Sequence, residues 1–270
     1  MDVVRVRILK DEGAVARSVA SQVAALIAER PDAVLGLPTG RTPIGLYAEL
    51  RERHAAGEID FSRVRTFNLD EFLGLPSNHP ASYRTFMDTH LFRHVNLPRR
   101  YIHFLNGMAA DAEAECRRYE AAIRKAGGLD LLILGIGANG HIGFNEPTRS
   151  VKANTHRAKL AAGTRRSNAD LFGGRAADVP REALSMGVGT ILRSREIVLI
   201  ATGAGKSAAI RATVDGPITS RVPASFLQLH GSVELMRLSP APASKFARTP
   251  LASPHDVAVL PLASAGPTSW

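Results

Sequence analysis

Apolar positions along this chain follow two patterns, and each predicts a different kind of element. In residues 14–30 they recur at helical spacing, which places Val15, Val19 and Val23 on one face of a helix. Residues 1–8 instead alternate apolar and polar side chains, as a first strand does. Short apolar runs without polar alternation predict buried parallel strands at residues 33–37, 64–69, 129–134 and 196–201.

Polar or glycine-rich turns follow these buried strands, and helices follow several of the turns. One helix runs from the turn at 38–43 to about His54, and another begins at Ser207 after the turn at 202–206. This alternation predicts an α/β protein with a doubly wound, mostly parallel, Rossmann-like sheet and helices on both faces. Ligand sites in such sheets lie beyond the carboxyl ends of the strands, so we expect the four turns to meet at one edge.

The composition changes near residue 238, which we expect to end a single domain spanning 1–238. In residues 239–270, 18 of 32 residues are Pro, Ala or Ser, which predicts an irregular tail with a short extended piece near 257–262. Within the domain, residues 149–181 carry eight Lys or Arg against two Asp. This basic stretch predicts a lid segment, at about 149–185, over an anionic ligand.

The overall composition is that of an ordinary globular protein, with 45% hydrophobic and 22% charged residues. No apolar run approaches the ~20 residues of a membrane helix, and the N-terminus lacks the order of a signal peptide. One cysteine, Cys116, excludes an intrachain disulfide. These features predict a cytoplasmic protein without a membrane partner. The net charge of +9 suits an anionic ligand, and because no nucleic-acid-binding motif is present, we expect a phosphorylated small molecule instead.

The glycine-rich turn within 134–147 carries the strongest candidate chemistry. It delivers His141 and, five residues later, Glu146, directly after the apolar run at 129–134. Imidazole titrates near neutral pH and a carboxylate can fix its tautomer, so the two form a candidate acid–base pair. Histidines and glycines also occur in purely structural turns, and this stretch alone leaves that alternative open.

Two other turns are candidates for anion binding. The first holds Thr39, Gly40, Arg41 and Thr42 directly before a helix, where backbone N–H groups favour a phosphate. The second ends with Lys206 at the start of the next helix. Neither turn matches a Walker motif or a dinucleotide motif, so no nucleotide cofactor is expected.

Two carboxylates, Asp70 and Glu71, directly follow the predicted strand at 64–69. A carboxylate at that place can act as a general base toward a carbon-bound proton, or it can cap a helix. A metal site is not expected, because these acids and His141 lack the ligand spacing of zinc proteins.

Several motifs, in this order and at nearly the same spacing, resemble those of the glucosamine-6-phosphate deaminases over about residues 1–235. The combination of Phe-Asn-Leu-Asp-Glu with Gly-His-Ile-Gly-Phe-Asn-Glu-Pro is specific, since the related 6-phosphogluconolactonases share the fold but usually lack it. The motifs are Leu37-Pro38-Thr39-Gly40, Thr42-Pro43, Phe67–Phe72, Gly74-Leu75, Ser82-Tyr83, Gly137–Pro147, Ala183–Thr190 and Leu227-Gln228-Leu229-His230.

The resemblance implies conversion of glucosamine 6-phosphate and water into fructose 6-phosphate and ammonia, without a cofactor. It implies that His141 opens the sugar ring, that Asp70 moves a proton from C2 to C1, and that Glu146 orients His141. Asn139 completes the implied catalytic group. The implied substrate-binding and phosphate-binding residues are Thr39, Gly40, Arg41, Thr42, Lys206, Glu71, Gly137 and Gly140.

Two departures from the family pattern concern the charge relay and regulation. Asn139 stands where some members carry Asp, so we expect the relay behind His141 to rest on Glu146 alone. His156 and Ala158 stand where regulated members have basic residues that bind N-acetylglucosamine 6-phosphate. We therefore expect no activation by that sugar.

A further departure affects the phosphate site. Asp170 stands where the family has an Arg that clamps the phosphate, and Arg41 stands where it usually has a small residue. We hypothesise that Arg41, or Arg166 or Arg175, supplies the missing cation. The alternatives are a galactosamine epimer as substrate, a 6-phosphogluconolactonase-like hydrolase, or a non-catalytic phosphosugar-binding protein. A homo-oligomer remains possible.

Overall fold

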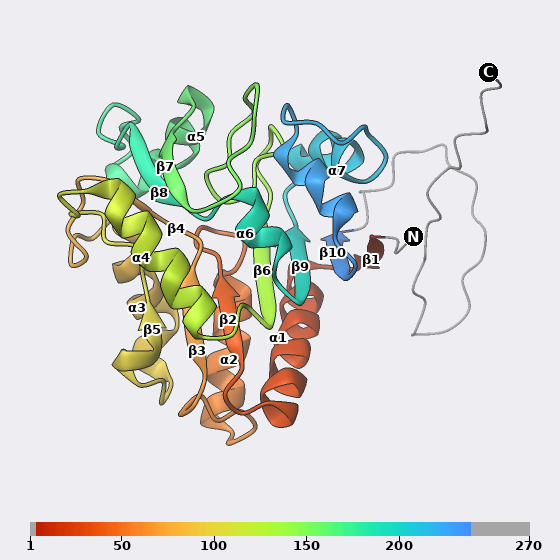
Figure 1. Cartoon of the computed structure of the whole chain (residues 1–270). Helices are drawn as coiled ribbons and strands as arrows, with labels where there is room; N and C mark the ends of the chain where they lie inside the picture. Colours follow the sequence, from red (N-terminus) through yellow and green to blue (C-terminus); the bar gives the residue numbers. More distant parts are fainter. Residues whose placement is uncertain (1–3, 239–270) are drawn as a thin grey trace, which may run out of the picture.

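The computed structural model describes residues 4–238, and a seven-stranded sheet forms its centre (Figure 1). All neighbouring strands pair in parallel, in the order β1-β10-β9-β6-β2-β3-β5. The predicted doubly wound, mostly parallel sheet is therefore confirmed. The strands are β1 (Arg5–Leu9), β2 (Val34–Leu37), β3 (Arg65–Asn68), β5 (Ile102–His103), β6 (Leu131–Gly135), β9 (Glu196–Ala201) and β10 (Val233–Leu238).

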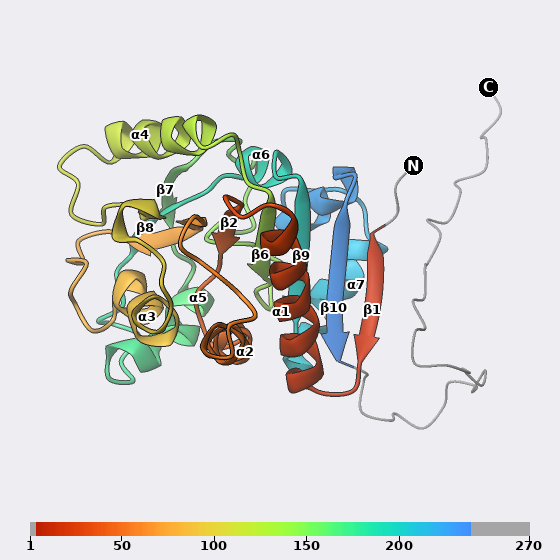
Figure 2. The same cartoon turned by 90° about the horizontal axis from the view of Figure 1, so that it is seen from below.

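Helices cover both faces of this sheet, as the view from below shows (Figure 2). Because side chains alternate along a strand, Leu132 and Leu134 of β6 pack with the α4 side, whereas Leu131 and Ile133 pack with the α1 side. One face carries α1 (Glu12–Glu29), α2 (Ile44–Ala55) and α3 (Tyr83–His90). The other carries α4 (Ala112–Lys125), α6 (Val188–Leu192) and α7 (Ser207–Val214).

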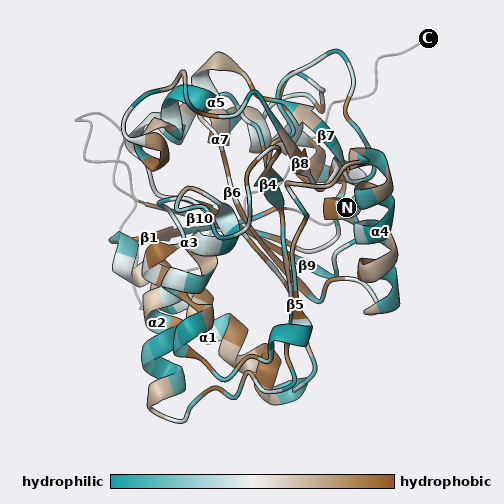
Figure 3. Cartoon of the chain, turned by 90° about the vertical axis from the view of Figure 1, so that its left-hand side faces the viewer, coloured by the Kyte–Doolittle hydropathy of each residue, from teal (hydrophilic) through white to brown (hydrophobic). Residues whose placement is uncertain are grey.

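The central strands β2, β6 and β9 are apolar on both faces, as their position between two helical layers requires. Figure 3 shows them in brown between helices whose outward faces are partly teal. The pattern explains why the sequence marked them as apolar runs without polar alternation. None of the helices within residues 4–238 is long and apolar enough to cross a membrane.

A small antiparallel sheet packs beside the main one and was not predicted. Its strands, in the order β4-β8-β7, are β4 (Asp70–Phe72), β8 (Glu182–Ser185) and β7 (His156–Lys159). The chain passes from β3 to β4 at Leu69, so Asp70 lies in the second sheet and not at the end of a main-sheet strand. The predicted lid segment forms β7, α5 (Ala162–Ser167), the short helix η3 (Ala169–Phe172) and β8.

The strand order reverses direction between β2 and β6. From β2 the chain continues outward to β3 and β5, whereas from β6 it continues the other way to β9 and β10. The turns after β2 and β6 therefore diverge from each other and leave a crevice at the carboxyl edge of the sheet. The turns at 38–43 and 136–143 flank this crevice.

Most elements that the sequence predicted are present with shifts of one or two residues at their ends. The predicted helix at 14–30 is α1 (Glu12–Glu29), and the predicted strand at 129–134 is β6 (Leu131–Gly135). The sequence reading missed β10, which lies between β1 and β9 and ends the described chain. The predicted tail at 239–270 and its extended piece near 257–262 lie outside the described residues.

Candidate active site

A cavity of about 920 Å³ opens at the carboxyl edge of the main sheet. Residues from all four predicted turns line it, so the expectation that these turns meet is confirmed. Of the residues predicted for the site, Glu71, Gly140 and Glu146 are not part of the lining. Those that line the cavity are Thr39, Gly40, Arg41, Thr42, Asp70, Gly137, Asn139, His141 and Lys206.

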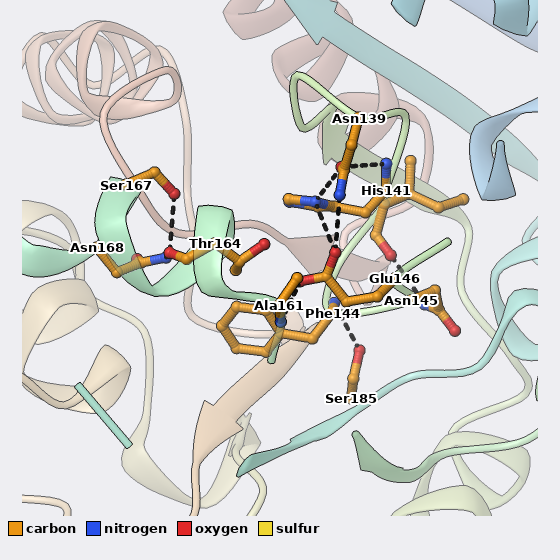
Figure 4. A network of polar contacts seen from close by, with 11 residues as sticks. Asn139, His141, Phe144, Asn145, Glu146, Ala161, Thr164, Ser167, Asn168 and Ser185 are labelled. Atoms are coloured by element: carbon orange, nitrogen blue, oxygen red, sulfur yellow. Dashed lines mark hydrogen bonds and ion pairs between the residues drawn. The ribbon is translucent and has the colours of Figure 1, made fainter. Parts of the chain in front are cut away.

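The turn after β6 holds three polar side chains in contact (Figure 4). The Nδ1 atom of His141 lies 2.7 Å from Oδ1 of Asn139 and 3.5 Å from Oε2 of Glu146. The Nδ2 atom of Asn139 donates to the same Oε2 atom at 2.9 Å. Asn139 therefore bridges the imidazole and the carboxylate, beside the direct contact between His141 and Glu146. That the charge relay rests on Glu146 alone stays a prediction.

This chain of contacts fixes the tautomer of His141. Burial raises the pKa of Glu146, but hydrogen bonding and charge from His141, together with the Asn139 amide, lower it to about 2. The ionised carboxylate only accepts hydrogen bonds, so the NH₂ group of Asn139 faces Glu146 and its oxygen faces His141. In the neutral imidazole, Nδ1 then carries the proton and Nε2 is left as a free base.

Gly137 is required because the imidazole ring packs directly against its Cα. A Cβ atom at this position would lie 2.2 Å from Cε1 of His141, closer than side chains can approach. The backbone N–H of Gly137 also donates to the carbonyl oxygen of His141 at 2.8 Å, which closes the turn. Gly137 thus shapes the place that His141 occupies.

Asp70 reaches the cavity from β4 and is buried. Burial, with a smaller contribution from the charge of Glu71, raises its pKa to about 8. Asp70 pairs with Ser185 in the antiparallel register of β4 and β8, which fixes its backbone at the floor of the cavity. The geometry provides a carboxyl group that can take a proton once its environment favours ionisation.

Glu71 points the other way and holds the start of α3. Its carboxylate accepts hydrogen bonds from the backbone N–H groups of Phe72 (2.9 Å), Tyr83 (3.1 Å) and Arg84 (3.0 Å). Burial raises its pKa to about 7, against these three hydrogen bonds, which lower it. The structure therefore gives Glu71 a structural place beside the site, outside the lining of the cavity.

Cationic side chains also line the cavity. Lys206 lies in the lining, and burial lowers its pKa. Arg41 and Arg166 also line the cavity, and Arg41 forms an ion pair with Asp170 of the lid segment. Arg175, the third candidate cation, pairs instead with Asp178 at 3.2 Å and does not line the cavity.

The sequence reading gave no role to three further residues of the lining: Tyr83, Thr164 and Asn168. Tyr83 belongs to the Ser82-Tyr83 motif, which was the only signal that could have marked it. Thr164 and Asn168 belong to the lid segment, which was recognised by its charge and not by its neutral polar residues. Their place in the site depends on how the lid segment packs.

The fold and the site together define a Rossmann-like protein whose cavity, at the switch point of the sheet, is lined by a histidine, a buried carboxyl group and cationic side chains. The family described as glucosamine-6-phosphate isomerases/6-phosphogluconolactonase matches residues 12–235. A glucosamine-6-phosphate deaminase of Thermoanaerobacter sp. (strain X514) is 50% identical over 210 residues, 78% of this chain and 83% of its own length. Glucosamine-6-phosphate deaminase 2 of Bacillus subtilis (strain 168) is 52% identical over 211 residues, 78% of this chain and 85% of its own.

Solved structures agree with these relatives. One, described as a monomeric glucosamine-6-phosphate deaminase, superposes with a TM-score of 0.85 at 41% identity and covers 87% of this chain and 98% of its own. A 6-phosphogluconolactonase of Thermotoga maritima reaches a TM-score of 0.69 at 19% identity, over 87% of this chain and all of its own, which is a likeness of fold alone. The chain belongs to the glucosamine-6-phosphate isomerase and 6-phosphogluconolactonase family.

Proposed function

We propose that this protein converts glucosamine 6-phosphate and water into fructose 6-phosphate and ammonia. The proposal is carried by a cavity that holds an oriented imidazole, a buried carboxyl group and cationic side chains. Residues His141, Asp70 and Lys206 represent these three parts. The relatives at about 50% identity, named glucosamine-6-phosphate deaminases, support the same substrate.

The phosphate group is proposed to bind at the turn at 39–42 and at the cationic side chains of the lining. The turn at 39–42 offers backbone N–H groups, and Gly40 adopts a positive φ of 98°, which favours glycine at this position of the turn. Lys206 and Arg41 supply positive charge from two sides. Because Asp170 already pairs with Arg41, the phosphate competes with this carboxylate for the guanidinium group.

His141 is proposed to open the sugar ring. With Nδ1–H donated to Asn139, the free Nε2 atom can take the proton of the C1 hydroxyl group and pass it to the ring oxygen as the C1–O bond of the ring breaks. The Asn139 amide and the ionised Glu146 then stabilise the protonated imidazole. The product of this step is the open-chain aldehyde.

Asp70 is proposed to carry out the isomerisation. Its carboxylate takes the proton from C2 and returns it to C1, while one proton passes from the C2 ammonium nitrogen to the C1 oxygen. The aldehyde thus becomes the C1 hydroxymethyl group, and C2 becomes an iminium. Water then adds to C2 and ammonia leaves, so that fructose 6-phosphate remains and the atoms balance. The positive ammonium group on C2 of the bound sugar favours the ionised form of Asp70, which burial disfavours in the free enzyme.

Ammonia release from the purified protein tests this function. Glucosamine 6-phosphate and its galactosamine epimer are compared as substrates, and hydrolysis of 6-phosphogluconolactone is measured beside them. Asp70→Asn is expected to lower ammonia release by about 10²-fold or more, since it removes the base. Asp32→Asn is the matched control, because Asp32 is exposed beside the amino end of β2, at the opposite end of the sheet.

Each outcome decides between the alternatives. Ammonia release that depends on Asp70 supports the deaminase, and the ratio between the two sugars identifies the substrate. Lactone hydrolysis without ammonia release would favour the related hydrolase. A folded protein that binds the phosphosugars but turns over none of the three compounds would be a binding protein.

A further inference from the structure

The hydroxyl group of Tyr83 lies where three walls of the cavity meet. Its ring is buried and stacks against Phe144, with centroids 5.9 Å apart and planes at 17°. Phe144 follows His141 in the turn after β6, so one side of Tyr83 packs against the segment that carries the proposed catalytic group. Thr39, from the turn after β2, lines the same cavity as Tyr83.

The third wall is the lid segment. The Tyr83 hydroxyl lies 3.1 Å from Oδ1 of Asn168, the residue that ends α5. The NH₂ group of Asn168 donates to the carbonyl oxygen of Thr164 at 2.9 Å, so its oxygen must face Tyr83. An amide oxygen only accepts, and therefore the tyrosine is the donor of this bond. Burial raises the pKa of Tyr83, which keeps its hydroxyl group protonated.

The other end of α5 contacts the catalytic group. The backbone N–H of Ala161, directly before α5, donates to Oε1 of Glu146 at 3.2 Å (Figure 4). Six residues of helix thus connect the Glu146 carboxylate to the Asn168 amide. A short helix transmits a displacement of one end to the other, because its backbone hydrogen bonds hold its length.

We propose that Tyr83 is a positioning residue that holds α5 over the cavity. The inference rests on the proposed function, because it assigns the phosphate of the substrate to the cavity that α5 borders. The start of α3 is held independently by the Glu71 carboxylate, so Tyr83 offers a fixed point for the lid segment. The bound phosphate benefits because α5, which carries Arg166 of the cavity lining, is aligned before it arrives.

Tyr83→Phe tests the proposal, because it removes the hydroxyl group and keeps the stacked ring. We expect KM for glucosamine 6-phosphate and the inhibition constant of inorganic phosphate to rise together, by about three- to tenfold, while kcat changes less than about twofold. Asn168→Ala removes the acceptor and should have the same effect. The double variant should be no worse than either single variant, since both break one hydrogen bond.

Tyr101→Phe serves as the matched control, because Tyr101 lies next to Arg100 at the start of β5 and does not line the cavity. It should leave KM and phosphate inhibition unchanged. A lowered melting temperature for Tyr83→Phe with unchanged KM and phosphate inhibition would make Tyr83 a core residue only. A loss of kcat at constant KM would assign the hydroxyl group to the chemistry at Asp70, and either result overturns the proposal.

Failure of the proposed function is distinguishable from failure of this inference. Binding of inorganic phosphate to wild type, Tyr83→Phe and Tyr101→Phe, measured by calorimetry, needs no turnover. If the wild type releases no ammonia, weaker phosphate binding by Tyr83→Phe still supports the positioning role. Equal phosphate binding by all three proteins contradicts the inference, whether or not the enzyme is active.

Discussion

At the scale of single residues, the site contains carboxyl groups whose ionised form is disfavoured by burial. Asp70 is a carboxyl group buried at the floor of a cavity, and Glu146 is a carboxylate kept ionised by its neighbours. A carboxyl group thus has a raised pKa in one place and a lowered pKa in the other. The difference comes from the surroundings of each group. Glu146 accepts hydrogen bonds from Asn139 and Ala161, whereas burial and the charge of Glu71 raise the pKa of Asp70.

The pKa of Asp70 predicts how the rate depends on pH. Since the base must be ionised, kcat/KM should rise with pH and reach half of its plateau near pH 8, the value to which burial raises the pKa of Asp70. In kcat, which reports the enzyme–substrate complex, the same limb should lie at lower pH because the ammonium group of the substrate stabilises the carboxylate. Initial rates between pH 5 and 9 check this, and a kcat/KM limb centred near pH 4 would contradict it.

The same burial predicts that Asp70→Asn is more stable than the wild type at alkaline pH. A carboxyl group with a pKa of about 8 in the folded state and 3.8 in the unfolded state binds more protons when folded. Its contribution to stability is therefore complete at low pH and is lost as the pH rises from about 4 to about 8. The difference in melting temperature between Asp70→Asn and the wild type should grow in favour of the variant as the pH rises to 8, and it should be smallest near pH 4. Equal melting temperatures at both pH values would argue against a neutral, buried Asp70.

Asp170→Asn should improve substrate binding. It frees Arg41 for the phosphate and removes a negative charge from the lining of the cavity, and because the ion pair is exposed we expect only a two- to fivefold decrease in KM, corresponding to less than about 1 kcal/mol. Asp178→Asn, which breaks the ion pair with Arg175 outside the cavity, is the control and should not change KM. A higher KM for Asp170→Asn would mean that the carboxylate positions Arg41 for the phosphate.

At the scale of elements, α3 has a cap that comes from a distant carboxylate. Ser82 accepts the N–H of Thr85 at 3.0 Å in the ordinary manner of a helix cap. The Glu71 carboxylate, from β4, adds acceptors for the first two N–H groups of the helix and for that of Phe72. The link ties α3 to the small sheet, which explains how Tyr83 is kept at a fixed place beside the cavity.

Loss of this cap should destabilise the protein. Glu71→Ala leaves three backbone donors without their acceptor in a buried place, which should cost roughly 2–4 kcal/mol and lower the melting temperature by about 5–10 °C. Glu71→Gln keeps one acceptor oxygen and should lie between this variant and the wild type. Thermal unfolding followed by circular dichroism measures the series, and a decrease under about 2 °C for Glu71→Ala would contradict the structural place of Glu71.

At the scale of the whole molecule, the lid segment contains the two positions, 156 and 158, at which we expect regulation to differ from that of regulated family members. Ala158 in β7 is buried against the neighbouring strand β8, where it pairs with Ala183, and His156 lies at the start of the same strand. Regulated members are expected to have basic residues at these two positions. The relative described as a monomeric deaminase offers a precedent for an enzyme without subunit contacts. That this chain forms a homo-oligomer stays a prediction.

We therefore expect velocity curves to be hyperbolic. N-acetylglucosamine 6-phosphate should not activate the enzyme, because this chain lacks the positive charges that would bind the phosphate of the activator at His156 and Ala158. Initial rates over a range of substrate concentrations, with and without the acetylated sugar, test this. A sigmoidal curve that becomes hyperbolic in its presence would contradict the prediction.

Local patterns in the sequence determined the elements and the chemistry of the turns. Four apolar runs marked the buried strands, the turns after them carried most of the polar groups of the site, and their order placed those turns at one edge. These features depend on nearest neighbours and on the alternation of strand and helix, so they can be read along the chain. The motifs also predicted the residues proposed for catalysis: Asp70, Asn139, His141 and Glu146.

Tertiary structure decided which way each side chain points and what it meets. Asp70 and Glu71 are neighbours in sequence, yet the alternation of β4 sends one into the cavity and the other under α3. The small sheet, the place of β10 and the contact between Tyr83 and Asn168 depend on residues far apart in the chain. Tyr83 and Asn168 are 85 residues apart, and β1 and β10 lie at the two ends of the described chain. Such pairs form because burial and hydrogen bonding select one packing of the whole chain, and no local pattern encodes them.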